Sequence, residues 1–290
     1  MIAGPTSPEQ GEIPFFIREV LKARVLQTSL REHPVLQLID PRRVRGLVEA
    51  SLDEIEKLEE VALGKKFNIP ASPQEAAKIK ALWVLSGPGT YDVATKDDRY
   101  QDRPWARWMD RKRLNYAATL TRKLTEIVVG IPRQSRPKGK ELMTEEVAQL
   151  RSSIERYGPY IIYNGRQDEN RVVENVLRRE GVMIPTGKVY VIYNNIDKTI
   201  DQVKSFRLPP DIQLETGDTI GVITHAPHMM RLMHILNYFK PFPENVTVQA
   251  FPLPSPYDGG QEHTMDEICG LLNYVFVSGG ATEEPYPYKL

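Results

Sequence analysis

The sequence has one cysteine among its 290 residues, so a disulfide within the chain is excluded. Chains that use no disulfides are typical of a reducing compartment. The sequence also lacks a run of about 18 uncharged apolar residues, which is the length that a membrane-spanning helix needs. Residues 1–16 contain no basic region followed by an apolar run, so we expect no signal peptide. These absences lead us to expect a cytoplasmic protein without a membrane span.

The sequence has no excess of charge of either sign. Its 38 basic residues balance its 38 acidic residues, which argues against a polybasic surface for nucleic acid or an anionic membrane. Apolar residues make up 41% of the chain, which is enough for a full hydrophobic core. The length fits one large domain, or one domain with an appendage. We therefore expect a globular protein that does not bind nucleic acid.

The N-terminal part of the sequence has a helical pattern. Asp40 and Pro41 form a start signal for one helix, because aspartate caps a helix and proline suits its first position. We assign residues 1–78 to a helical N-terminal extension that covers the main domain or mediates homo-oligomer formation. Apolar residues recur at helical spacing in two runs: Ile17, Val20, Leu21, Val25 and Leu26, and then Val44, Leu47, Val48, Leu52, Ile55 and Leu58.

From residue 79 onward, short apolar runs alternate with amphipathic helices. This alternation predicts βαβ units with right-handed crossovers. The fold class is therefore α/β, a three-layer Rossmann-like fold with a mostly parallel sheet, and this domain covers residues 79–290. The predicted strands are 81–85, 160–163, 189–193, 219–224 and 246–251, and the predicted helices are 104–128, 142–157, 168–180, 197–207, 227–239 and 264–277.

In such sheets, ligands bind outside the carboxyl ends of the strands. The first strand is followed by small residues, Ser86, Gly87 and Gly89, which let backbone N–H groups approach a ligand. A long polar segment, 91–103, comes next and is interpreted as a lid. Arg113 follows on the next helix. This first loop is neither a Walker loop nor a G-x-G-x-x-G loop, so it predicts no particular ligand alone.

The second and third strands are also followed by polar residues. Asn164 and Gly165 end the second strand, and Glu169 begins the next helix, one turn before its sheet-facing side. A carboxylate at that position points inward, where it either acts in function or only stabilises the helix N-terminus. After the third strand, Thr199 and Gln202 share one face of a short helix.

The segment after the fourth strand is the most informative. Thr224 ends the strand, and His228 and Arg231 lie three residues apart in the first turns of the next helix, beside its predicted buried stripe. An imidazole and a guanidinium at a helix N-terminus suit an anion. The alternative is a hydrogen-bonded histidine and a surface arginine.

These four segments together resemble a known family. Thr224, His228 and Arg231 match the T-x-x-x-H-x-x-R element of the YdcF/SanA/ElyC-like family, a widespread Rossmann-like domain of unknown function. Glu169 and Leu177, with the Gly181-Val182 pair, match its E-x7-L-x3-G-V helix. The resemblance covers residues 81 to about 240.

The other elements match less closely. Thr199 matches the threonine of the family's T-x-x-N element, but Gln202 replaces the asparagine. Asn164-Gly165 stands where the family usually has Ser-Gly, and Ser86-Gly87 resembles its first glycine loop. Arg113 resembles the arginine seven residues before a leucine, here Leu120. Residues 121–158 are longer than the usual connection. The resemblance implies a link to cell-envelope processes or to nucleotide-like ligands, and no settled reaction.

We weigh three functions for this sequence. The first is a site that binds, or acts on, an anionic small molecule such as a nucleotide, S-adenosylmethionine or a phosphorylated sugar, with Glu169 and His228 as catalytic candidates. The second is a non-catalytic interaction protein that uses the helical N-terminal region and the Pro/Tyr-rich tail 284–288. The third is a metal site, for which the histidines lack carboxylates or thiolates in a complete ligand set, so no metal is predicted. The sequence pairs no nucleophile with a base, so binding and catalysis both stay open.

Overall fold

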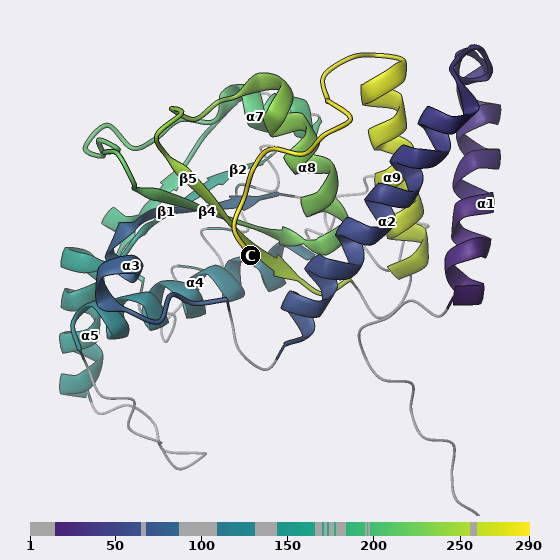
Figure 1. Ribbon diagram of the computed structural model, residues 1–290. Helices are drawn as coiled ribbons and strands as arrows, with labels where there is room; N and C mark the ends of the chain where they lie inside the picture. Colours follow the sequence, from purple (N-terminus) through teal and green to yellow (C-terminus); the bar gives the residue numbers. More distant parts are fainter. Residues whose placement is uncertain are drawn as a thin grey trace, which may run out of the picture.

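The structure is a computed structural model that describes residues 15–64, 68–86, 109–130, 144–165, 170, 173, 177, 184–194, 196, 198–255 and 260–290. A parallel sheet lies at its centre, with helices on both faces (Figure 1). The strands are β1 (Ile79–Leu85), β2 (Tyr160–Asn164), β3 (Val189–Val191), β4 (Thr219–His225) and β5 (Thr247–Leu253). The helices are α1 (Phe15–Glu32), η1 (Pro34–Leu38), α2 (Pro41–Leu63), α3 (Pro73–Lys78), α4 (Met109–Val128), α5 (Thr144–Tyr157), η4 (Thr186–Lys188), α7 (Thr199–Ser205), α8 (Ala226–Phe239) and α9 (Gly260–Phe276).

The sheet has five strands in the order β3-β2-β1-β4-β5, and every pair is parallel. The chain builds outward from β1 through β2 to β3, and then returns to β4 on the other side of β1. The strand order therefore reverses between β1 and β4, which is where doubly wound sheets form a ligand crevice at their carboxyl ends. The predicted fold class is confirmed.

Side chains alternate between the two faces of the sheet and build two cores. On one face, Ala81, Trp83 and Leu85 of β1 pack with α2, α8 and α9. On the other face, Leu82 and Val84 pack against α3, α4 and α5. Both faces are covered, so β1, β4 and β5 are almost entirely buried, as in other parallel sheets.

The two N-terminal helices belong to the first of these cores. Asp40 caps α2 by accepting the backbone N–H of Arg42, as the sequence predicted. One stripe of α2 is buried, and the helix packs against α8 and β5, while α1 packs against α9. The buried residues of this stripe are Val44, Leu47, Val48, Ser51, Leu52, Ile55 and Leu58.

The C-terminal tail lies along β5. Lys289 forms a parallel bridge with Gln249, through Lys289 N–H to the Val248 carbonyl at 2.9 Å and Ala250 N–H to the Lys289 carbonyl at 2.8 Å. Earlier in the tail, the backbone N–H of Tyr286 donates to the Met233 carbonyl of α8. The tail therefore covers the open edge of the sheet.

Most of the predicted helix 168–180 lies outside the described residues. The other predicted elements agree with the structure to within a few residues where it describes them, with one difference of substance. We expected α8 to have a buried stripe with His228 and Arg231 beside it. Instead, α8 is buried on nearly every side, and His228 is only 4% exposed. The reason is that α2, α7 and α9 pack against the sides of α8 that the sheet leaves open. Within the part of the chain that the structure describes, no helix is long and apolar enough to cross a membrane.

Candidate functional site

Arg113 lies at the point where the strand order reverses. It comes from α4 and is fully buried. Its Nη1 donates to the Leu85 carbonyl at the end of β1, at 2.8 Å, and its Nε donates to Nδ1 of His225 at the end of β4, at 3.1 Å. One guanidinium therefore joins the carboxyl ends of the two strands that border the expected crevice.

His225 is the last residue of β4 and the N-cap of α8. Burial lowers the pKa of its imidazole well below the usual value, and the neighbouring Arg113 lowers it further. The ring of His263 from α9 stands edge-on to it, with ring centres 6.2 Å apart. His225 is therefore neutral at physiological pH.

Each ring nitrogen of His228 lies within hydrogen-bond distance of a threonine hydroxyl. Nδ1 lies 3.1 Å from the hydroxyl of Thr224, and Nε2 lies 3.1 Å from the hydroxyl of Thr199. Burial lowers the pKa of His228 well below its usual value, and Arg231 adds to this effect although Glu267 opposes it. The ring therefore joins the end of β4 to the start of α7 as a neutral group.

Arg231 connects this histidine to α9. Its Nη2 donates to the Thr199 hydroxyl at 3.2 Å, and its Nε forms an ion pair with Oε2 of Glu267 at 2.7 Å. Glu267 also pairs with Nε2 of His263 at 3.3 Å. Burial alone would raise the pKa of Glu267, but the Arg231 guanidinium holds it well below the usual range. Thr224, His228, Thr199, Arg231 and Glu267 thus form one connected polar chain.

A second polar cluster fixes the ends of β1 and β2 to α7. The side-chain amide of Gln202 donates to Ser86 and to the Asn164 carbonyl. Asn164 in turn accepts a 2.8 Å hydrogen bond from Nε1 of Trp83 and donates to the Gln202 carbonyl at 2.6 Å. These predicted ligand-binding side chains are buried and already hold protein partners. Within the described residues, they hold the ends of β1 and β2 against α7.

The predicted site residues after β1 and β2 fall partly inside and partly outside the described part of the chain. Gly165 is described, and its N–H donates to Oδ1 of Asn170 at 3.1 Å, which closes the turn after β2. Gly87, Gly89, Glu169 and the predicted lid 91–103 lie outside the described residues. The site therefore brings together Ser86, Arg113, Asn164, Gly165, Thr199, Gln202, Thr224, His228 and Arg231 from the predicted set.

The charge of the site differs from our expectation. At the positions matched by the resemblance, the sequence has Arg113, Arg231 and His228 against Glu169 as the acidic residue. Glu267 neutralises Arg231, and His228 is neutral.

Sequence reasoning missed the contribution of α9. His263 and Glu267 are four residues apart on one helix face, and this spacing of a basic and an acidic group was a usable local signal. Gly270, three residues after Glu267, lets the Arg231 side chain lie against α9, because a Cβ there would collide with its guanidinium. That this face meets Arg231 depends on tertiary packing, which the sequence does not display.

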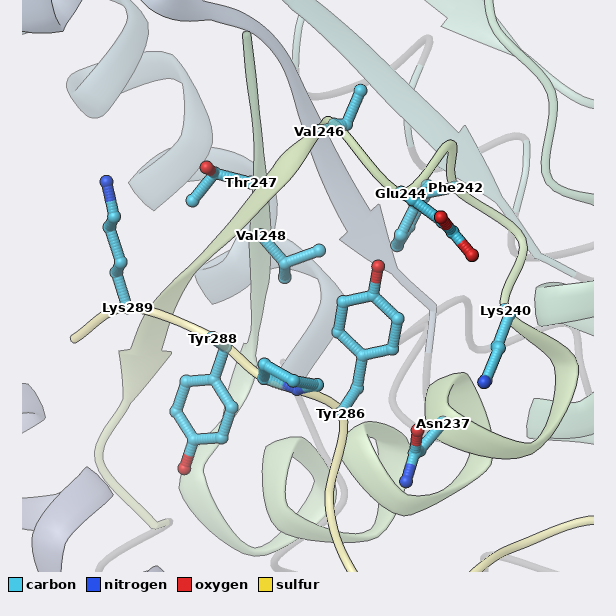
Figure 2. A pocket seen from close by; sticks show the side chains of 11 residues that line it. Asn237, Lys240, Phe242, Glu244, Val246, Thr247, Val248, Tyr286, Tyr288 and Lys289 are labelled. Atoms are coloured by element: carbon cyan, nitrogen blue, oxygen red, sulfur yellow. The ribbon is translucent and has the colours of Figure 1, made fainter. Parts of the chain in front are cut away.

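Elsewhere, a pocket of about 470 Å³ opens between the C-terminal tail and the start of β5. Its wall contains Phe242, Tyr286, Lys240 and Lys289, and the two lysines lie at opposite ends of it (Figure 2). It contains none of the predicted site residues and lies at the amino end of β5, away from the carboxyl ends of β1 and β4. Among the described residues, no group of three or more histidine, cysteine, aspartate or glutamate side chains is arranged to hold a metal ion.

Comparison with protein-family models, with curated proteins and with solved structures gives no match for this chain.

Proposed function

We propose that the chain binds a small anionic ligand, such as a nucleotide, S-adenosylmethionine or a phosphorylated sugar, at the carboxyl ends of β1 and β4. The observation that carries this proposal is the position of Arg113, which is buried and bonded to both strand ends at the switch point. A guanidinium there favours negative charge in a ligand, and the N-terminus of α8 adds partial positive charge.

The resemblance to the YdcF/SanA/ElyC-like family supports the same location. Its matched residues Thr199, Thr224, His228 and Arg231 come from α7, β4 and α8, and they form one hydrogen-bonded chain. Separate segments of sequence that match one family and also meet in space support a shared site. We propose that the chain is a relative of this family.

We propose binding rather than catalysis as the function of the described groups. Both ring nitrogens of His228 lie next to threonine hydroxyls, and burial lowers its pKa well below the usual value, so the imidazole is a weak proton acceptor. The interaction-protein alternative would use α1, α2 and the tail. The buried stripe of α2 and the backbone of the tail already contact the body of the molecule.

The proposal is tested by a thermal-shift screen of matched pairs: AMP and adenosine, glucose 6-phosphate and glucose, and S-adenosylmethionine. A ligand at about 100 times its dissociation constant stabilises the folded state by about 2.7 kcal/mol, which raises the melting temperature by several degrees. We expect the anionic member of a pair to give the larger shift. Equal shifts within each pair, or shifts from the neutral members alone, would refute an anion site.

Two variants of Arg113 sharpen this screen. Arg113→Met removes the charge at similar length, and we expect it to abolish the difference between AMP and adenosine. Arg113→Lys keeps the charge and should retain part of that difference. Urea unfolding of each variant shows whether it folds, and the wild-type pairs carry the test if Arg113→Met does not.

A further inference from the structure

The two neutral histidines at the carboxyl end of β4 differ in which of their nitrogens are engaged. His228 has a hydroxyl partner on each ring nitrogen. In the described part of the chain, His225 has one recorded hydrogen bond, between its Nδ1 and Arg113. His228, which the family element matches, therefore has partners on both ring nitrogens, whereas His225 has a recorded partner on Nδ1.

The partner of His225 determines where its proton lies. A guanidinium has only donor hydrogens and stays charged in proteins. Because Nε of Arg113 donates to Nδ1 at 3.1 Å, Nδ1 must be an unprotonated acceptor. The neutral ring therefore carries its proton on Nε2. Arg113 fixes this tautomer, and its guanidinium is held in place by a hydrogen bond to the Leu85 carbonyl.

A neutral imidazole with this tautomer is a hydrogen-bond donor and a poor base. The positive charge behind Nδ1 disfavours a second proton on the ring and polarises the remaining N–H. An imidazole kept neutral in this way suits donation to a carbonyl, carboxylate or phosphoryl oxygen. Among the described residues, the groups that act on this ring are Arg113 of α4 and His263 of α9, with smaller contributions from His228 and Lys112.

We propose that His225, and not His228, contacts the ligand, by donating its Nε2–H to a ligand oxygen beside the carboxyl ends of β1 and β4. His228 is then a positioning residue that ties α7 to β4 through Thr199 and Thr224. This inference rests on the proposed function, and it adds that the ligand presents an oxygen acceptor to His225. Arg113 acts on the ligand through His225 as well as through its charge.

The test is a long-range ¹H–¹⁵N NMR spectrum of protein labelled with ¹⁵N-histidine, in which His225→Gln identifies the signals of His225 among five histidines. In the free protein we expect a protonated Nε2 and an unprotonated Nδ1 from pH 6 to pH 8. On titration with inorganic phosphate, and separately with AMP, we expect the Nε2 signal of His225 to move more than those of His228.

The outcomes separate the two proposals. A proton on Nδ1, or a doubly protonated ring at pH 7, overturns the assignment of His225 whatever the ligand does. If phosphate or AMP moves the other histidines but leaves His225 unchanged, the donor role is wrong and the anion site stands. If no histidine responds to either probe and the thermal screen gives no shift, both proposals are wrong.

Substitution gives a second, independent measurement. Glutamine places an amide that can accept from Arg113 and donate to a ligand, whereas leucine does neither. We expect His225→Leu to weaken phosphate or AMP binding by about tenfold or more, which corresponds to one lost hydrogen bond to a charged group. His225→Gln should stay within about threefold of wild type. Equal losses in the two variants would indicate a purely structural histidine.

Discussion

The carboxyl edge of the sheet and the α1–α2 pair use charged side chains in opposite ways. At the carboxyl edge, Arg231 and Glu267 pair with side chains that are 18% and 10% exposed. On the α1–α2 surface, Lys22 pairs with Glu49 and Arg18 pairs with Asp53, and here the carboxylate side chains are 50% and 56% exposed. The α1–α2 helices are held to the rest of the molecule by a buried apolar stripe.

Exposed and buried ion pairs differ in what they contribute to the free energy of folding. Exposed ion pairs contribute little, because water and salt screen them. Buried charges cost several kcal/mol to desolvate and are retained only when each is paired. A region that holds a buried arginine, a buried glutamate and neutral histidines has a desolvation cost that an apolar core of the same size would not have. Such regions are candidates for function.

The largest effect is expected from breaking the buried pair. Glu267→Gln leaves the Arg231 charge without a counter-charge and should destabilise the protein by about 3 kcal/mol or more. The free energy of unfolding is measured by urea denaturation. Glu262→Gln, an exposed residue in the first turn of the same helix, is the matched control and should cost less than about 1 kcal/mol. Similar costs for the two variants would contradict the contrast.

A second large effect concerns pH. Below about pH 6.5 the histidines of the unfolded chain bind protons, while burial lowers the pKa of His225 and His228 in the folded chain. The unfolded state then takes up more protons, so stability falls as the pH falls. Each histidine contributes a loss of about 1.4 kcal/mol per pH unit.

Urea denaturation at pH 7.0, 6.0 and 5.5 measures this slope. The Glu267 carboxylate, whose pKa is held low, adds a further loss only in stronger acid. His33→Gln should leave the slope unchanged, because His33 lies outside this network. Constant stability between pH 7.0 and 5.5 would mean that the two imidazoles are not held neutral by the fold.

Two helical glycines give a matched test of smaller size. Gly46 lies on α2 with nothing near its Cβ position, so Gly46→Ala should stabilise the protein by about 1 kcal/mol. Gly270→Ala should gain nothing, because its Cβ displaces the Arg231 guanidinium from α9. Differential scanning calorimetry compares the two melting temperatures. An equal gain at both positions would show that Arg231 moves aside without cost.

The elements of the fold could be predicted because they depend on local patterns. The apolar runs at β1 and β4, the Asp40–Pro41 start of α2 and the helix after Thr224 are all visible within a few residues of sequence. The burial of α8 on nearly every side could not be predicted, because it results from helices that are distant in sequence. Periodicity reports how many apolar residues a helix has, and not how many neighbours will cover it.

The site could be predicted in part for the same reason. The rule that ligands bind at the carboxyl ends of strands led to Ser86, Arg113, Thr224 and Arg231, which the structure places near one another. The same rule cannot show that Gln202 bonds to Asn164, or that Asn164 accepts a hydrogen bond from Trp83. Nor can it show that α9 returns from the end of the chain to neutralise Arg231 through Glu267.

The smallest effect is expected on the α1–α2 surface. Glu49→Gln breaks the exposed pair with Lys22 and should cost less than about 1 kcal/mol. In 0.5 M NaCl this cost should disappear, because the Debye length falls to about 4 Å. The cost of Glu267→Gln should persist in the same salt, since its partner charge is buried. Urea unfolding of both variants at low and high salt tests the contrast directly. A salt-sensitive Glu267→Gln would mean that water reaches the Arg231–Glu267 pair, and the carboxyl edge would then resemble the helical surface.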